Sequence, residues 1–169
     1  HAMEFETIET YITFDELGGI KEILPRTRND AHKLIEECML LANVAAAEYS
    51  LEHDIPMLYR VHEAPEFSRI QKVRDFVKLL GLPFPEQPPQ ADYQRVIEAT
   101  KDRLDAPSIH AVLLRSMMQA YYGANNAGHY GLAYEAYTHF TSPIRRYPDL
   151  LLHRAIKAYL DKKAYPLSG

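Results

Sequence analysis

The sequence has little cysteine, no long apolar run and no excess of positive charge, and each shortage excludes a class of protein. Cys38 is the only cysteine among 169 residues, so no internal disulfide can form. Its place on an apolar helical stripe predicts a small buried side chain in a reducing compartment. No apolar stretch approaches the ~20 residues of a membrane-spanning helix, and no charged-then-apolar signal segment opens the chain. We therefore expect a cytoplasmic protein with no membrane partner.

The charge balance is acidic, with a formal net charge of −4 and a pI near 6.1. A self-sufficient nucleic-acid binder usually carries an overall basic footprint, so any contact with phosphate has to be local. The hydrophobic content of 47% and the chain length are enough for a packed core, which excludes a disordered chain.

The first three residues, His1, Ala2 and Met3, have the composition of an expression scar, and Ser168 and Gly169 are similar in kind. We exclude His1 from any ligand argument. No repeat of fixed period and no linker divides the rest, so residues 4–169 are expected to form one unit.

Hydrophobic periodicity predicts an α+β fold that is mostly helical. An N-terminal β-hairpin is expected over residues 5–14 and 20–24, with its turn at 15–19, and one short strand over 57–61. About five helices are expected, at residues 30–49, 66–80, 92–103, 107–122 and from 149 onward. An isolated hairpin is marginally stable, so its open edge is expected to pair with another segment or with a second copy.

The helix from Asp30 is expected to bury a long apolar stripe. Its members are Leu34, Ile35, Cys38, Leu41, Ala42, Ala45 and Tyr49. Glu36 and Asn43 lie seven residues apart and so share a second face. That face is either an ordinary solvated face or a functional one.

Residues 139–150 carry the most specific pattern in the chain. Ser142 and Pro143 read as the N-cap and first residue of a helix. Arg145 and Arg146 would then sit in the first turn, where the helix dipole already presents partial positive charge. This conflict needs a negative partner.

Two partners remain open from the residues alone. A bound anion could be held by free backbone N–H groups, the Thr141 and Ser142 hydroxyls and a guanidinium. Alternatively, Asp149 lies four residues after Arg145 and could neutralise it within the helix.

Aromatic residues gather over residues 121–147, which indicates either a core corner or a surface on which bases stack. The set comprises Tyr121, Tyr122, Tyr130, Tyr134, Tyr137, Phe140 and Tyr147. Nucleophilic catalysis and binding of a nucleotide by a glycine-rich loop are poorly supported, because no nucleophile elbow, Walker loop or dinucleotide fingerprint is present. His129, His139 and His153 are spaced too widely for a compact zinc site, so no metal ligands are expected here.

Five segments together resemble a known family. They are residues 28–42, 58–62, 114–117, 128–133 and 139–154. This ordered set is similar to the ribonuclease II/ribonuclease R exoribonucleases, most of all to the bacterial ribonuclease R branch. The resemblance covers nearly the whole chain and corresponds to the C-terminal half of that family's RNB catalytic domain, so the chain is expected to be a partial RNB domain.

The resemblance implies a processive 3′→5′ exoribonuclease that binds the 3′ end of single-stranded RNA. It hydrolyses the RNA to nucleoside 5′-monophosphates with divalent metal, usually Mg²⁺. By the same resemblance, Arg145 is the catalytic residue at the scissile phosphate, and Glu36 contacts the 3′-terminal nucleotide. Asn43 joins Glu36 as a substrate-binding candidate through their shared direction.

Further candidates for the RNA channel or its support follow from the matching motifs. They are His129, Tyr130 and Arg146, together with the Thr141 and Ser142 hydroxyls of the anion site. The sequence departs from the family pattern in one respect: no segment resembles the cluster of aspartates that binds the metal ions. We therefore expect Mg²⁺ in the full-length enzyme only, and an inactive fragment. The alternative is a non-catalytic RNA-binding or interaction module of the same fold.

Overall fold

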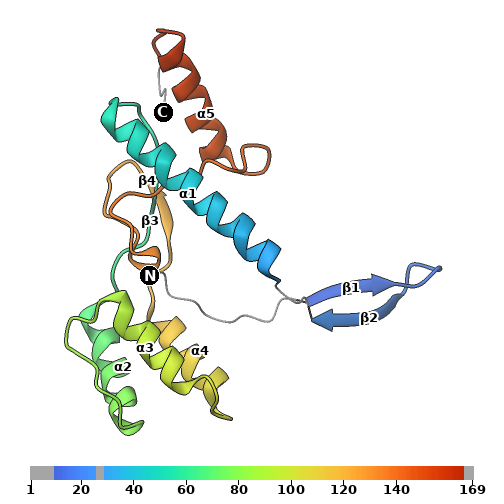
Figure 1. Cartoon of the computed structure of the whole chain (residues 1–169), viewed down its shortest axis with the longest axis vertical. Helices are drawn as coiled ribbons and strands as arrows, with labels where there is room; N and C mark the ends of the chain where they lie inside the picture. Colours follow the sequence, from blue (N-terminus) through green and yellow to red (C-terminus); the bar gives the residue numbers. More distant parts are fainter. Residues whose placement is uncertain (1–9, 26–28, 166–169) are drawn as a thin grey trace.

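The computed structural model describes residues 10–25 and 29–165 (Figure 1). Over these residues the chain has the expected α+β fold, with five α-helices, one 3-10 helix and two small antiparallel sheets. In chain order the elements are β1 (Thr10–Phe14), β2 (Ile20–Pro25), α1 (Asp30–Glu52), β3 (Tyr59–Val61), α2 (Phe67–Leu79), α3 (Gln90–Thr100), α4 (Ala106–Ser116), β4 (Tyr121–Gly123), η1 (Tyr130–Leu132) and α5 (Tyr147–Leu160).

Strands β1 and β2 form the expected hairpin, which projects away from the helices (Figure 1). Its turn is fixed by Asp15, whose Oδ1 accepts hydrogen bonds from the backbone of Leu17 and Gly19. Ile12 lies opposite Ile23, and both are exposed. The sheet has no third strand within the described ranges. The expected strand residues 5–9 and the terminal residues 1–3 and 168–169 lie outside those ranges.

Helix α1 forms where expected, but its expected core stripe is wrong. Leu34 and Leu41 are 65% and 64% exposed, and Cys38 is exposed rather than buried. The N-cap is Asn29, whose side chain accepts a hydrogen bond from the His32 backbone, and not Asp30. The residues that α1 does bury are Asn43, Ala46, Ala47 and Ser50. Periodicity finds the apolar face of a helix, but only a neighbouring element can cover it, and the covered face here belongs to the C-terminal half.

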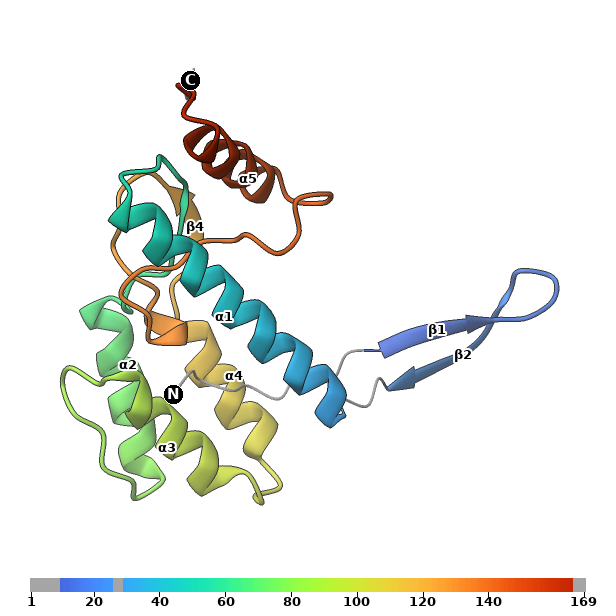
Figure 2. The same ribbon diagram turned by 45° about the horizontal axis from the view of Figure 1, so that its top comes forward.

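Helices α2, α3 and α4 pack around one core at one end of the molecule (Figure 2). Its fully buried members include Val77, Tyr93, Ile109 and Leu113. Helix α2 ends as expected before Gly81, which adopts a φ of +74° that suits glycine. This core therefore joins the three helices expected between residues 66 and 122.

Helix α4 is shorter than expected, because it ends at Ser116 and not near residue 122. Met117 turns to an extended backbone, and Tyr121–Gly123 then pairs as strand β4 with β3. If α4 continued to residue 122, strand β3 would have no partner for its backbone N–H and C=O groups. Pairing of β4 with β3 provides hydrogen bonds for both segments. The second sheet therefore has two short strands where the sequence predicted one.

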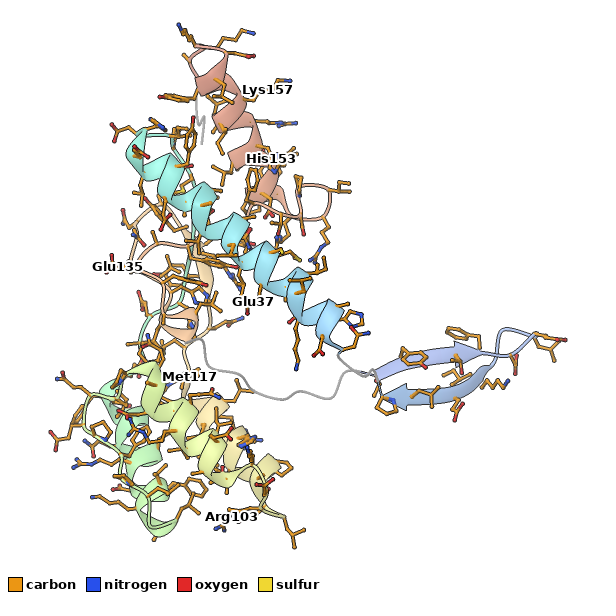
Figure 3. The ribbon with its side chains drawn as sticks, viewed as in Figure 1. Glu37, Arg103, Met117, Glu135, His153 and Lys157 are labelled. Atoms are coloured by element: carbon orange, nitrogen blue, oxygen red, sulfur yellow. The ribbon has the colours of Figure 1, made fainter. Side chains whose placement is uncertain are left out.

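A second core joins α1 to α5. Ala46 and Ala47 of α1 pack with Met57 and Leu152, and Phe140 closes the edge of this cluster. Figure 3 shows His153 on the part of α5 that lies next to α1. None of the helices in the described ranges combines the length and the apolar character needed to cross a membrane.

Candidate functional site

Residues 141–146, here named the Arg145 loop, connect the second sheet to α5. The backbone N–H groups of Arg145 and Arg146 both donate to the Ser142 carbonyl, at 3.3 and 3.0 Å, so Ser142 and Pro143 begin a single turn. Helix α5 starts only at Tyr147, so the expected helix start at Ser142 is wrong. The reason is Pro148: a helix that began at Pro143 would hold Pro148 in its interior, which costs ~3 kcal/mol or more.

The Asp149 carboxylate holds the loop from inside. It is fully buried, and its Oδ2 accepts hydrogen bonds from the Ser142 backbone at 2.8 Å and from Nη2 of Arg146 at 2.8 Å. Nε of Arg146 lies 3.1 Å from the same oxygen. The alternative of an Arg145–Asp149 pair is therefore wrong, because Arg146 occupies the acid.

Arg145 is exposed, and its guanidinium has no hydrogen bond or ion pair with any described residue. The Ser142 hydroxyl likewise has no partner among them. A guanidinium presents five N–H donors in a planar fork that matches the oxygens of phosphate. The loop therefore offers one unneutralised cation beside a hydroxyl, on a backbone fixed by Asp149.

Asn43 fixes the other end of the loop. Its Oδ1 accepts hydrogen bonds from the backbone of Phe140 at 2.9 Å and of Thr141 at 3.2 Å, and its Nδ2 donates to Oη of Tyr137 at 2.9 Å. Asn43 is 3% exposed, so a solvated face is the wrong description at this position. Its amide is used internally, which gives it a supporting role, and the expected contact of Asn43 with substrate stays a prediction.

Glu36 lies two turns before Asn43 on the exposed half of α1.

Phe140 and His153 also stabilise the end of the loop. Their rings stack with centroids 4.1 Å apart, and Nε2 of His153 lies 2.8 Å from the Phe140 carbonyl oxygen.

The pKa of His139 depends on the charges around the Arg145 loop. Burial, followed by the charges of Arg146, Arg60 and Arg145, lowers this pKa to about 4, whereas Asp149 opposes them. The imidazole is therefore neutral at pH 7, in a region where guanidinium groups outnumber carboxylates. This local positive field stands in contrast to the acidic balance of the whole chain.

His129 packs edge-on against Tyr137, with ring centroids 5.2 Å apart, and Tyr130 follows it at the start of η1. Oη of Tyr130 donates to the Pro88 carbonyl, and the ring packs on the core of α2, α3 and α4. Nδ1 of His129 accepts a hydrogen bond from the Leu132 backbone, and burial beside His62 lowers its pKa to about 4. Both rings line a shallow hollow of about 310 Å³. These contacts are those of supporting residues.

No group of three or more His, Cys, Asp or Glu side chains in residues 10–25 and 29–165 is arranged to hold a metal ion. These residues do not by themselves fit a Mg²⁺ site, and we derive no metal-assisted step from them.

Comparison with known proteins decides the family. The RNB domain matches residues 1–162, almost the entire chain. The chain belongs to the RNB family. Ribonuclease R of Vibrio parahaemolyticus is 52% identical over 164 residues, and that of Escherichia coli K12 is 47% identical over 163. These matches cover 96% and 95% of this chain but 20% of each relative, so the RNB chain spans about a fifth of their length.

Solved structures agree with this assignment. Apo RNase R of Mycoplasma genitalium superposes with a TM-score of 0.86 at 29% identity, over 96% of this chain and 26% of that one. The same enzyme in complex with double-stranded RNA gives 0.87 at 29% identity, over 96% and 30%. Yeast Ssd1, a pseudonuclease, gives 0.72 at 26% identity, over 83% and 18%. The expected resemblance to the ribonuclease II/ribonuclease R exoribonucleases and the partial RNB fold are confirmed.

Within this RNB chain, the structure brings Asn43, Thr141, Ser142, Arg145 and Arg146 into one neighbourhood. The sequence did not predict two supporting residues. They are Tyr137, whose Oη accepts a hydrogen bond from the Asn43 amide, and Arg60, which lies near His139. Arg60 belongs to a matched segment, so that segment carried a signal for it, but nothing in the spacing along the chain indicated that β3 would lie beside the Arg145 loop.

Proposed function

We propose that this RNB chain is the phosphate-holding part of a processive 3′→5′ exoribonuclease, which hydrolyses the 3′ end of single-stranded RNA to nucleoside 5′-monophosphates. The observation that carries the proposal is the exposed, unpaired guanidinium of Arg145 on a loop fixed by Asn43 and Asp149. The RNA complex of the Mycoplasma relative supports RNA as the ligand.

The chemistry follows from charge. Hydrolysis of a phosphodiester places additional negative charge on the phosphoryl oxygens in the transition state, and a donor already in position stabilises that charge with little reorganisation. Arg146 cannot act in this way while Asp149 neutralises it. Arg145 is therefore the catalytic residue of the proposal, and Arg146 positions the loop.

The remaining candidates take binding roles. Glu36 contacts the 3′-terminal nucleotide, and the Thr141 and Ser142 hydroxyls lie beside the phosphate. His129 and Tyr130 support the wall of the RNA channel from the α2–α4 side. Divalent metal, Mg²⁺ by the family resemblance, is held in the full-length parent by residues other than 10–25 and 29–165 of this chain.

A second candidate is a non-catalytic RNA-binding or interaction module. The likeness to the pseudonuclease Ssd1 favours it weakly, because that protein shares the fold at a TM-score of 0.72. The two candidates differ in whether the full-length parent releases mononucleotides.

The experiment compares this chain with its full-length parent on uniformly labelled single-stranded RNA, with Mg²⁺ present. We expect mononucleotides from the parent, and from this chain no more than from a protein-free control. Robust release by this chain alone would contradict the proposal that it supplies the phosphate-holding part of the active site only. A folded parent that binds RNA without cleaving it would favour the non-catalytic module.

A further inference from the structure

We propose that Arg60, stacked on Tyr122 beside His139, is a second phosphate-binding guanidinium, which holds the RNA backbone at a different nucleotide from the phosphate at Arg145. This inference rests on the proposed function, because it extends the same RNA path. Its ligand class is a polyanion with phosphates in series, as in single-stranded RNA.

The site is built on paired strands. Arg60 of β3 lies opposite Tyr122 of β4 in the antiparallel register, and its Cζ is 4.9 Å from the centroid of the Tyr122 ring. Oη of Tyr122 lies 2.7 Å from Nδ1 of His139. The Arg60 backbone donates to the Tyr137 carbonyl at 2.8 Å, which ties this strand to the chain leading into the Arg145 loop. A rigid platform of this kind lowers the entropy lost on binding.

The charge of Arg60 is not neutralised by any described acid. It forms no salt bridge with a described residue, although its side chain is half-buried. A cation–π contact uses the face of the guanidinium and leaves the N–H donors at its edge available. A partly desolvated guanidinium without a carboxylate is stabilised when an anion reaches those donors.

His139 connects the two arginines. The charges of Arg60 and Arg145 both lower the pKa of this one imidazole, so both guanidinium groups lie within electrostatic reach of it. Asp149, the acid that acts on the same imidazole, already pairs with Arg146. Two separate unneutralised cations around a neutral ring suit a ligand that carries repeated negative charge, and the RNA backbone is such a ligand.

A purely structural role for Arg60 makes a different prediction. If the guanidinium only packs on Tyr122, its loss lowers stability but leaves the salt dependence of RNA binding unchanged. A phosphate contact releases counterions, so its loss makes the dependence of log affinity on log salt less steep by about 0.7 for a single strand.

The test uses the full-length parent without metal, so that labelled single-stranded RNA binds but is not cleaved. Arg60→Ala is expected to weaken affinity roughly three- to tenfold near physiological salt and to make the salt slope less steep by about 0.7. Arg60→Lys should keep most of the slope, whereas Arg60→Gln should lose it. Arg103→Ala removes an exposed arginine at the far end of the α3–α4 unit (Figure 3) and should change neither quantity.

The outcomes separate this inference from the proposed function. Wild-type affinity and slope in a folded Arg60→Ala or Arg60→Gln protein would overturn the Arg60 contact and leave the proposed function intact. A wild-type parent that does not bind single-stranded RNA would overturn both. If Arg60→Ala does not fold, the comparison of Lys with Gln at this position decides the question.

Discussion

Asp149 pairs with Arg146 and leaves the adjacent Arg145 without an acidic partner. Oδ2 of Asp149 lies 2.8 Å from Nη2 of Arg146, and Arg145 forms no salt bridge with any described carboxylate. Two neighbouring arginines therefore differ in their surroundings, because one buried acid pairs with Arg146 and not with Arg145. We propose that the neutralised arginine holds the loop and that Arg145 is available to a ligand.

Replacing Arg145 tests the catalytic role. In the full-length parent, Arg145→Ala should lower turnover roughly 10²- to 10³-fold, because an interaction made chiefly in the transition state acts on kcat. RNA affinity should fall far less. Steady-state kinetics with equilibrium RNA binding measures both, and Arg103→Ala is the matched control. Equal loss of turnover and affinity would assign Arg145 to ground-state binding instead.

Asn43→Ala should destabilise the protein and misplace the Arg145 loop. The backbone N–H groups of Phe140 and Thr141 would lose their acceptor, which costs about 1–3 kcal/mol for buried donors. Asn43→Asp keeps the acceptor but loses the donor to Tyr137 and places a carboxylate at a buried position, so it should also destabilise the protein. Urea denaturation gives the free energy of unfolding. Equal stability of both variants and wild type would show that this link does not hold the loop.

Glu36 tests the contact with the terminal nucleotide. Glu36→Ala in the parent should weaken handling of that nucleotide by roughly 1–3 kcal/mol if the contact is a buried hydrogen bond in the complex. Glu37→Ala removes the neighbouring carboxylate, which projects about 100° further around α1, and serves as control. Binding of short RNA and the pattern of final products are measured. Identical results for the two variants would remove Glu36 from the site.

The histidines predict a dependence of stability on pH. Burial lowers the pKa of His129 and of His139 to about 4 from an ordinary 6.5. The unfolded chain therefore binds more protons than the folded chain between these values, so stability is fully present above pH 6.5 and declines as the pH falls toward 4. His139→Gln should flatten part of this decline in urea denaturation. A wild-type protein equally stable at either end of that range would contradict the prediction.

The hairpin predicts self-association of this chain. Ile12, Phe14, Ile20 and Ile23 are 46–63% exposed, and both outer strand edges are open in the described structure. Sedimentation velocity over micromolar to millimolar concentrations should show a growing dimer or larger species. Phe14→Lys should reduce it, whereas Leu104→Lys, at an exposed apolar residue away from the hairpin, should not. A monomer throughout, or equal effects of both variants, would exclude the hairpin as the contact.

Helical periodicity and turn residues predicted an element well where residues close in the sequence form it. The periodicity of residues 66–80 and the stop at Gly81 gave α2, and the turn at 15–19 gave the hairpin. The helix start at Ser142 was wrong, although Pro148 in the same sequence argues against it. The stripe of Leu34 and Leu41 was also wrong, because periodicity cannot tell which half of a long helix another element covers.

The sequence by itself determined the family, the helices and the presence of two adjacent arginines in a loop rich in hydroxyls. The start of α5 at Tyr147 decided which arginine is neutralised, since Asp149 pairs with Arg146 at the i,i+3 spacing there, and the tertiary structure added the Ser142 backbone N–H to the same carboxylate. The tertiary structure also decided that Asn43 supports the loop and that Arg60 joins this region. Long-range contacts depend on how separate elements pack in space, and spacing along the chain does not encode that packing locally.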